Sequence, residues 1–327
     1  MQTPIRTGSR ILAAQIVLAT FSSLAVAQSS QRAADDGRRI SGAIYNLGAY
    51  ERLPDDVRRE LDQTATRASY DSALQDHNFV LERVRYRSDG LSVIAYVYRP
   101  ARNDLAPRPA IIYSRGSFIA GDLAPVLAPM FHRLALEGFT VVAPQYRGSD
   151  GGEGKDEMGG ADVNDVLNAV RLAASLRGVD SSQLFLYGES RGGMMTYQAI
   201  RAHAPIKAAA VVGAFTDLDS LLARDPRSRG AAAKIWPDYA SRSAEIATKR
   251  SADRWARELT VPLLILHGGA DPQVPPSQAL RLALKLDELG RAYELHVVAG
   301  GSHTLFARAA ERDAAVATWF RRYATTR

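Results

Sequence analysis

Residues 183–200 of this chain read QLFLYGESRGGMMTYQAI. The apolar run 183–187 is typical of a buried strand, and residues 193–200 are typical of a helix. Gly188-Glu189-Ser190-Arg191-Gly192 stands between them and fits the pattern of a sharp strand-to-helix turn that exposes its serine. The serine takes a strained backbone conformation, and glycines avoid collisions with the neighbouring strand and helix. We therefore predict that Ser190 is a nucleophile, provided that an acid and a base follow in the correct chain order.

The rest of the chain alternates strands and helices. Residues 79–86 and 91–98 form an expected hairpin around the turn at 88–90. Further strands are predicted at 110–113, 139–143, 206–212, 261–266 and 293–298, and helices at 125–136, 162–176, 277–289 and 305–323. Short apolar strands separated by helices indicate a parallel sheet covered on both faces. An antiparallel hairpin leading into a mostly parallel, doubly wound sheet resembles the α/β-hydrolase fold, and we predict this fold for residues 79–327.

Two segments depart from the alternation. Residues 28–78 are polar and rich in Arg, Asp and Ala, and we predict a mobile start followed by one or two helices, such as 55–68. Residues 216–259 contain short helical patterns and no strand pattern. In the fold that this chain resembles, an insertion at this place lies over the active site. We therefore predict a small helical cap, with Trp236 and Tyr239 among the substrate contacts; a surface excursion without a role in binding is the alternative.

The N-terminus has the pattern of a secretory signal peptide. Arg6 and Arg10 precede the apolar stretch 11–26, and Ala25-Val26-Ala27 is a small-x-small site before Gln28. We predict cleavage after Ala27 and export to the periplasm or the medium. Retention as a membrane anchor is the alternative, although the stretch contains polar residues and is short for a membrane span. No stable membrane insertion is expected after cleavage.

The composition is that of an ordinary globular protein and excludes several other classes. The 327 residues are 46% hydrophobic and 23% charged, which is ample for one large core. There is no cysteine, so disulfides and thiolate zinc sites are excluded. The formal charge of +6 comes from scattered arginines often beside acids, as in residues 55–60, and no nucleic-acid-binding motif accompanies it. We expect neither a nucleic-acid partner nor a metal or organic cofactor.

An acid and a base do follow the serine in the required order. A serine nucleophile needs a base to take its proton, and the base needs an acid to fix its tautomer. In this fold the chain order is Ser, Asp or Glu, then His. Asp271 follows the strand at 261–266, and His303 follows the strand at 293–298. Both stand beyond the carboxyl ends of strands, where ligands bind in open α/β sheets. We predict Asp271 as the acid and His303 as the base.

Other histidines and acids of the chain are alternatives for these roles. His267 ends the strand at 261–266 and competes with His303, but packing or a hydrogen bond that shapes the Asp271 loop fits it better. The remaining histidines lie before the core or inside predicted helices and strands. Asp217 and Asp219 follow the strand at 206–212 and are the alternative to Asp271.

The negative oxygen of a tetrahedral intermediate needs two hydrogen-bond donors. One is expected to be the backbone N–H of Arg191, directly after the nucleophile, and the other to come from the loop after the strand at 110–113. Gly116 lets that backbone approach closely, so we predict the amides of Gly116 and Ser117. Arg115 either reaches the substrate or forms a surface ion pair.

Residues 80–325 resemble the catalytic domain of the prolyl oligopeptidase family and related α/β-hydrolase esterases. The matching stretches are 142–149, 159–166, the serine turn, 267–275 and 301–305. The resemblance implies Ser190, Asp271 and His303 as the catalytic triad, and peptide or ester bonds as substrates. Members of the peptidase family carry a β-propeller before the catalytic domain, and residues 28–78 are too few for one. The prolyl-cleaving members have a tyrosine near Arg115, so proline specificity is not expected.

We therefore predict an exported serine hydrolase with peptidase-like activity on small peptides. A carboxylesterase that acts on small acyl or sugar esters is the close alternative. A non-catalytic binding protein on a hydrolase scaffold is the third possibility.

Overall fold

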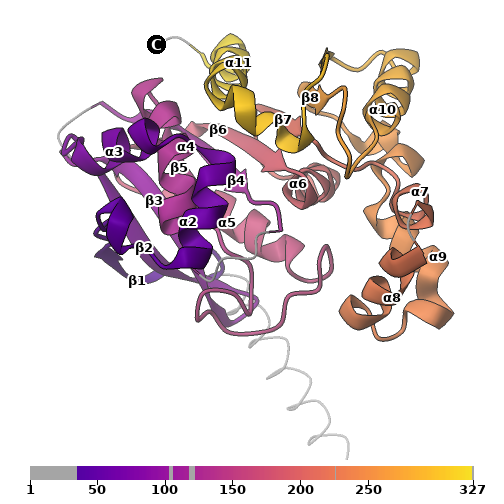
Figure 1. Ribbon diagram of the computed structural model, residues 1–327, viewed down its shortest axis with the longest axis horizontal. Coiled ribbons are helices and arrows are strands. Elements are labelled where there is room, and N and C mark those ends of the chain that lie inside the picture. The colour runs from indigo at the N-terminus through magenta and orange to yellow at the C-terminus, as the bar shows by residue number, and fades with distance from the viewer. Residues whose placement is uncertain (1–34, 103–105, 118–121, 225, 326–327) are drawn as a thin grey trace, which may run out of the picture.

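The computed structural model describes residues 35–102, 106–117, 122–224 and 226–325. The predicted signal peptide lies outside these residues. Nine strands form one open sheet in the order β1-β2-β3-β5-β4-β6-β7-β8-β9 (Figure 1). Strands β1 to β3 and the β3–β5 pair are antiparallel, and the remaining pairs are parallel. This arrangement is the predicted α/β-hydrolase fold.

The strands are β1 (Arg39–Ile44), β2 (Phe79–Ser88), β3 (Leu91–Pro100), β4 (Arg108–Ser114), β5 (Thr140–Pro144), β6 (Val179–Glu189), β7 (Ala208–Val212), β8 (Leu263–Gly268) and β9 (Tyr293–Val298). The predicted hairpin is confirmed, because β2 and β3 pair without interruption from Phe79↔Pro100 to Ser88↔Leu91.

The α-helices are α2 (Asp55–Thr64), α3 (Arg67–Gln75), α4 (Ala124–Leu136), α5 (Val163–Ser175), α6 (Arg191–Arg201), α7 (Leu218–Ala223), α8 (Pro226–Ile235), α9 (Tyr239–Arg250), α10 (Pro276–Glu288) and α11 (Ala309–Tyr323). Short 3-10 helices are η1 (Tyr50–Arg52), η2 (Ala252–Arg254), η3 (Ala256–Glu258) and η4 (His303–Arg308). None of the helices in the described part of the chain has both the length and the apolar character needed to cross a bilayer.

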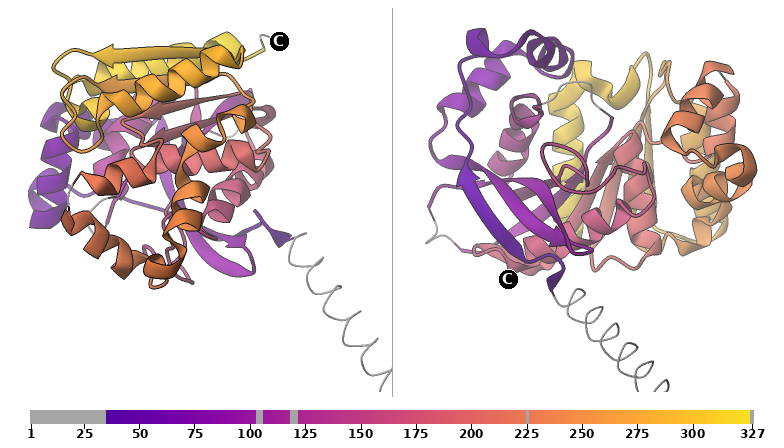
Figure 2. Two further views of the ribbon diagram at one scale, coloured as in Figure 1. Left: turned by 90° about the vertical axis from the view of Figure 1, so that its right-hand side faces the viewer. Right: turned by 90° about the horizontal axis from the view of Figure 1, so that it is seen from below.

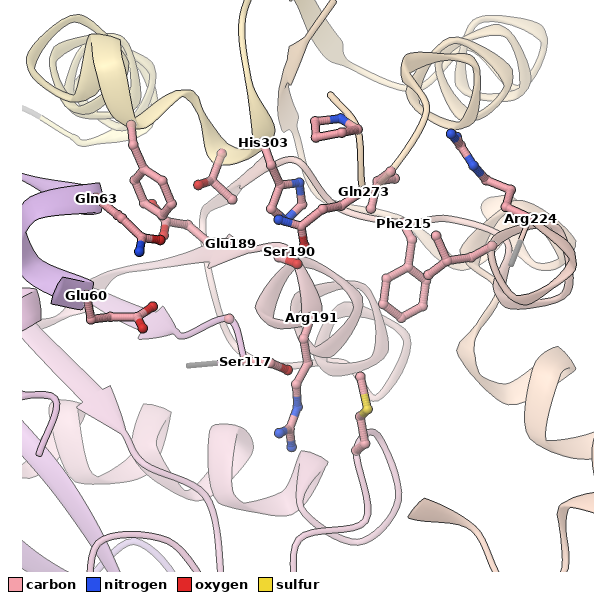
Figure 3. A pocket seen from close by; sticks show the side chains of 17 residues that line it. Glu60, Gln63, Ser117, Glu189, Ser190, Arg191, Phe215, Arg224, Gln273 and His303 are labelled. Carbon is pink, nitrogen blue, oxygen red and sulfur yellow. The ribbon is translucent and has the colours of Figure 1, made fainter. Parts of the chain in front are cut away.

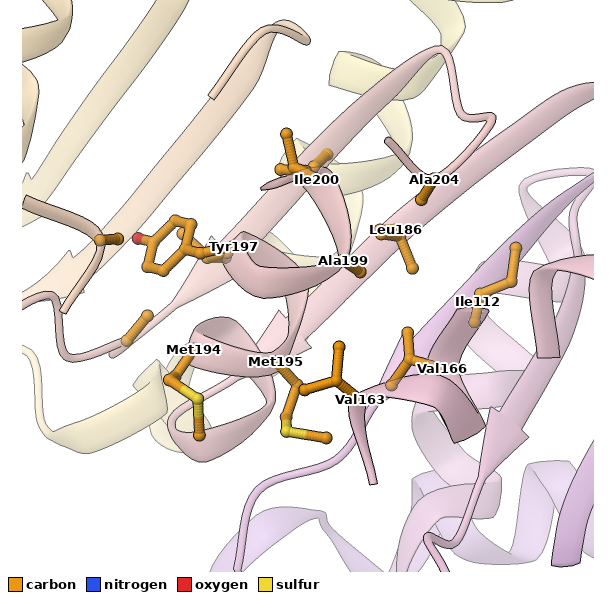
Figure 4. Close-up of a cluster of buried hydrophobic side chains, with 14 of the residues drawn as sticks. Ile112, Val163, Val166, Leu186, Met194, Met195, Tyr197, Ala199, Ile200 and Ala204 are labelled. Atoms are coloured by element: carbon orange, nitrogen blue, oxygen red, sulfur yellow. The ribbon is translucent and has the colours of Figure 1, made fainter. Parts of the chain in front are cut away.

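Helices cover both faces of the sheet. Successive residues of each central strand point to opposite sides, so side chains on both faces are buried. Ile112 and Leu186 pack with α5 and α6 on one face, as Figure 4 shows. Their neighbours Ile111 and Phe185 pack with α4 and α11 on the other face. Helices α2 and α3 lie against the outer side of α4. The apolar runs of these strands are therefore continuous because the sheet is covered on both faces, as predicted.

Three elements near the chain ends differ from the sequence-based expectation. Strand β1 was not predicted, because its residues are exposed and Gly42 interrupts the pattern; it is an edge strand held by pairing with β2. The helix expected at 55–68 is two helices, with Thr66 capping α3 through its side chain. The last helix begins at Ala309 rather than at residue 305, because Thr304 and Leu305 have left-handed backbone conformations.

The segment between β7 and β8 is helical, as predicted. Helices α7, α8 and α9 gather at the end of the molecule where α10 lies (Figures 1 and 2). Helix α9 packs on α6, the helix that follows the serine turn. The insertion is therefore attached to the element that carries Ser190.

Candidate active site

The serine turn has the strained geometry that its sequence predicts. Ser190 joins β6 to α6 with φ 53° and ψ −118°, a conformation that side-chain-bearing residues rarely adopt. Its amide N–H donates to the carbonyl of Val212 at 2.8 Å, which ties the turn to the end of β7. Helix α6 begins directly after it, so the turn lies at the helix N-terminus at the carboxyl edge of the sheet.

Gly192 is required because α6 begins against the end of β4. A Cβ atom at this position would lie 1.7 Å from the carbonyl oxygen of Ser114. No rotamer removes this collision, because both partners are backbone.

We expect Gly192→Ala to displace the serine turn and to destabilise the protein by about 3 kcal/mol, the upper end of the usual overpacking cost. Thermal unfolding measures this effect. Gly48→Ala is the matched control, because a Cβ at Gly48 meets nothing within 4 Å. An unchanged melting temperature for Gly192→Ala would contradict the proposed packing.

Asp271 and His303 are brought together, although 32 residues separate them. The Nδ1 atom of His303 lies 2.7 Å from Oδ2 of Asp271, and the carboxylate is buried. The other oxygen, Oδ1, accepts the amides of Gln273 and Val274 at 2.8 and 2.9 Å. Burial alone would raise the pKa of Asp271, but hydrogen bonds from His267, His303 and Val274 outweigh it and hold the pKa well below its usual value. The carboxylate therefore stays ionised.

The loops that carry these two side chains are in backbone contact. The amide of Gly269 donates to Val298 at 2.7 Å, and the amide of Ala270 donates to Gly301 at 2.9 Å. A Cβ at Gly268 would lie 2.2 Å from the carbonyl oxygen of Ser302, so only glycine permits this approach. The contact fixes the spacing between the acid and the histidine.

The alternative histidine and acids, His267, Asp217 and Asp219, make other contacts in the structure. His267 is fully buried, and its Nε2 lies 2.9 Å from the carbonyl oxygen of Val274, so it shapes the Asp271 loop as expected. Asp217 caps α7 by accepting the amide of Ser220. Asp219 pairs with Arg254.

Ser190 and His303 line one cavity of about 600 Å³, shown in Figure 3. The three residues predicted to surround an oxyanion, Gly116, Ser117 and Arg191, line it too. These residues come from three segments far apart in the chain, and Asp271 contacts His303 from a fourth.

The side chains of Arg115 and Arg191 are buried and bonded to the loops around the site. Arg115 is buried and donates to the carbonyls of Gly116 and Gln145 at 3.0 and 2.8 Å. Arg191 pairs with Asp156 and Asp162. Both guanidinium groups lie over the ring of Tyr146, at 4.8 and 4.5 Å from its centroid. Arg115 thus holds the predicted oxyanion loop and is not among the residues that line the cavity.

The structure places the two predicted cap contacts outside this cavity. Trp236 lines a separate cavity of about 300 Å³. The ring centroid of Tyr239 lies 6.1 Å from that of Trp236. The indole N–H of Trp236 donates to the carbonyl of Glu157 at 2.8 Å. From the insertion, Leu221 and Arg224 line the Ser190 cavity instead.

Helix α2 supplies the opposite wall, which sequence analysis missed. Glu60 and Gln63 line the Ser190 cavity, and Figure 3 shows both side chains directed toward it. A second cavity of about 710 Å³, between α2–α3 and the start of α11, shares Gln63 and His303 with the first. The cleft therefore extends to both sides of His303. Nothing in the local pattern of α2 signals this role, because it depends on how α2 packs on α4.

The sheet order, the serine turn and the shared cavity define an α/β-hydrolase-fold enzyme. A sequence model of the prolyl oligopeptidase family matches residues 128–327. The chain belongs to this family, and it is a serine hydrolase.

Relatives and solved structures agree with this assignment. The chain is 26% identical to the uncharacterized peptidase YtmA of Bacillus subtilis over 65% of its length and 82% of that protein. A Mycobacterium tuberculosis puromycin-hydrolyzing peptidase is 26% identical with a TM-score of 0.65, over 76% of this chain and 40% of that one. The Pyrococcus furiosus esterase PF2001 shares the fold at 16% identity and a TM-score of 0.59, over 76% of this chain and 93% of that one. The chain thus spans most of YtmA and less than half of the mycobacterial peptidase.

Proposed function

We propose that the protein is an exported serine peptidase that cleaves acyl bonds of small peptides through Ser190, His303 and Asp271. The observation that carries the proposal is the 2.7 Å contact between His303 and a buried Asp271, on the cavity that Ser190 lines. Membership of a peptidase family supports the choice of peptide substrates.

The geometry supports the following sequence of steps. Asp271 accepts a hydrogen bond from the Nδ1–H of His303, so Nε2 is the basic nitrogen. Nε2 takes the proton of Ser190 Oγ as this oxygen attacks the acyl carbon, and the backbone amides of Arg191 and of the Gly116–Ser117 loop stabilise the oxyanion. His303 then protonates the leaving group, which departs on its side of the cleft. Water releases the acyl group by the same steps, with His303 again as base.

Paired initial rates on one acyl group, offered as an ester and as an amide, test the substrate class. Amide turnover comparable to ester turnover is the expected result. Turnover of the ester alone would favour the second candidate, a carboxylesterase on small acyl or sugar esters. That candidate is supported by 33% identity over 117 residues to a probable acetylxylan esterase A of Aspergillus terreus, which covers 33% of this chain.

Glu60 places a carboxylate on the wall of the cavity opposite the insertion. We expect it to favour substrates with a positively charged group near the scissile bond, such as a free α-amino group. Glu60→Gln should raise KM for free-amine peptides by about tenfold, the effect of one partly exposed charge-assisted hydrogen bond. N-acetylated versions of the same peptides are the control, because they lack the charge. An equal change for both substrate series would contradict this role.

Export rests on the signal-peptide pattern of residues 1–27. The mature protein recovered from outside the cytoplasm should begin at Gln28, which N-terminal sequencing reads directly. A retained leader would favour the membrane anchor.

A further inference from the structure

Arg312 of α11 contacts both the turn that carries His303 and the turn that carries Ser190. Its Nη1 donates to the carbonyl oxygen of Thr304 at 2.9 Å and lies 2.7 Å from Oε1 of Glu189. Thr304 follows His303, and Glu189 precedes Ser190. One guanidinium nitrogen therefore joins the neighbour of the base to the neighbour of the nucleophile.

The turn that Arg312 holds is strained. Thr304 and Leu305 have φ values of 54° and 59°, in the left-handed region. A β-branched residue in this region is unusual, because its Cβ crowds the backbone. Such a conformation persists only where surrounding contacts hold it. The buried side chain of Leu305 and the bond from Arg312 to Thr304 are two such contacts.

Glu189, the partner of Arg312 beside the nucleophile, is also held in place. The carboxylate of Glu189 is buried and accepts the hydroxyls of Tyr113 and Tyr187 at 2.8 and 3.0 Å. Burial raises the pKa of both tyrosines, so they remain neutral donors. Glu189 therefore cannot follow Arg312 if the histidine turn moves.

The charges of this cluster balance. Glu189 and Asp313 are the anions, and Arg312 and Arg133 are the cations; Arg133 lies 2.7 Å from Asp313. Burial alone would lower the pKa of Arg312, but Asp313 and Glu189 raise it well above its usual value, so the guanidinium stays charged. Loss of Arg312 alone would leave a buried carboxylate without compensation, which destabilises a protein whatever its function.

We propose that Arg312 is a positioning residue for the hydrolytic reaction: it holds the His303 turn at a fixed distance from the Ser190 turn. This inference rests on the proposed triad. It also gives a role to Glu189, the variable position of the serine motif, as the anchor on the nucleophile side.

The test distinguishes a positioning role of Arg312 from a role in neutralising the buried carboxylates alone. Arg312→Met combined with Glu189→Gln removes one cation and one anion, so the cluster stays neutral while the bond to Thr304 is lost. We expect kcat on p-nitrophenyl acetate to fall about 100-fold, as for a displacement of about 1 Å at a reacting group, with KM nearly unchanged. Val316→Ala is the matched control, because it removes buried volume from the same helix and leaves Arg312 and its bond to Thr304 in place.

The outcomes are distinct. Val316→Ala should lower the unfolding temperature and leave kcat unchanged. A double variant that keeps the wild-type kcat, or a control that loses as much kcat as the double variant, would overturn the inference. If the double variant does not fold, Arg312→Lys is the second test. Lysine keeps the positive charge but loses the planar guanidinium that contacts Thr304 and Glu189 together. An unchanged kcat in this variant would then overturn the inference. A folded wild type without Ser190-dependent turnover would instead refute the proposed function.

Discussion

Replacing Ser190 with alanine should reduce kcat by at least about 10⁴-fold, because no other group then attacks the acyl carbon. The turn itself should survive, because alanine keeps the Cβ atom and loses only the hydroxyl. Substrate binding should be retained, so KM should change little. Initial rates on an ester substrate, with circular dichroism to confirm folding, measure the effect.

Ser117→Ala is the matched control for this prediction. Ser117 is an exposed serine that lines the same cavity, and its proposed contribution is its backbone amide. It should therefore keep most of the wild-type rate. Equal losses in the two variants would show that the hydroxyl of Ser190 has no special role.

Replacing Asp271 with asparagine should reduce kcat by about 10⁴-fold through the tautomer of His303. The amides of Gln273 and Val274 donate to one oxygen of Asp271, so the asparagine oxygen should take that place. Its NH₂ group would then face Nδ1 of His303 and donate to it. The histidine proton would be forced onto Nε2, the nitrogen that must accept the proton of Ser190.

The charge of Asp271 also contributes to stability, and the pH dependence of this contribution follows from the pKa of Asp271. Because the pKa of this carboxyl is held well below its usual value, the wild type carries the charge throughout the neutral and weakly acidic range. The contribution of this charge to the free energy of unfolding should therefore be constant between about pH 5 and pH 8. The stability contributed by the charge should disappear only as the pH falls below the usual carboxyl range, toward the lowered pKa.

Asp217→Asn and Asp219→Asn are the controls, because these residues are the alternative acids. Asp217 caps a helix and Asp219 lies in an exposed ion pair, so each variant should retain most of the activity. A larger loss of kcat in either of them than in Asp271→Asn would contradict the assignment of Asp271 as the catalytic acid.

Local patterns predicted most of the sheet and the residues that meet at its edge. The apolar runs of β4 to β8 are continuous because both faces of the sheet are covered, and the serine turn has a sequence signature. Strand β1 has no such signal, since it is an exposed edge strand defined by its partner.

Contacts between distant segments explain what the sequence did not predict. Glu60 reaches the cleft because α2 packs on α4, and Arg312 meets Glu189 because α11 lies under the serine turn. Trp236 was predicted as a substrate contact because it belongs to the insertion expected over the active site. In the structure its indole N–H donates to the carbonyl of Glu157 and attaches the insertion to that loop. Such roles follow from tertiary packing and not from residue type.

Labelling with a fluorophosphonate, followed by mass spectrometry, tests the central claim most directly. The reagent forms a covalent bond only with a serine that is activated by its neighbours. We predict one adduct per folded chain, located on the peptide that contains Ser190 and absent in Ser190→Ala. A folded wild type that remains unlabelled, or that carries the adduct on another residue, would contradict the assignment of Ser190 as the nucleophile.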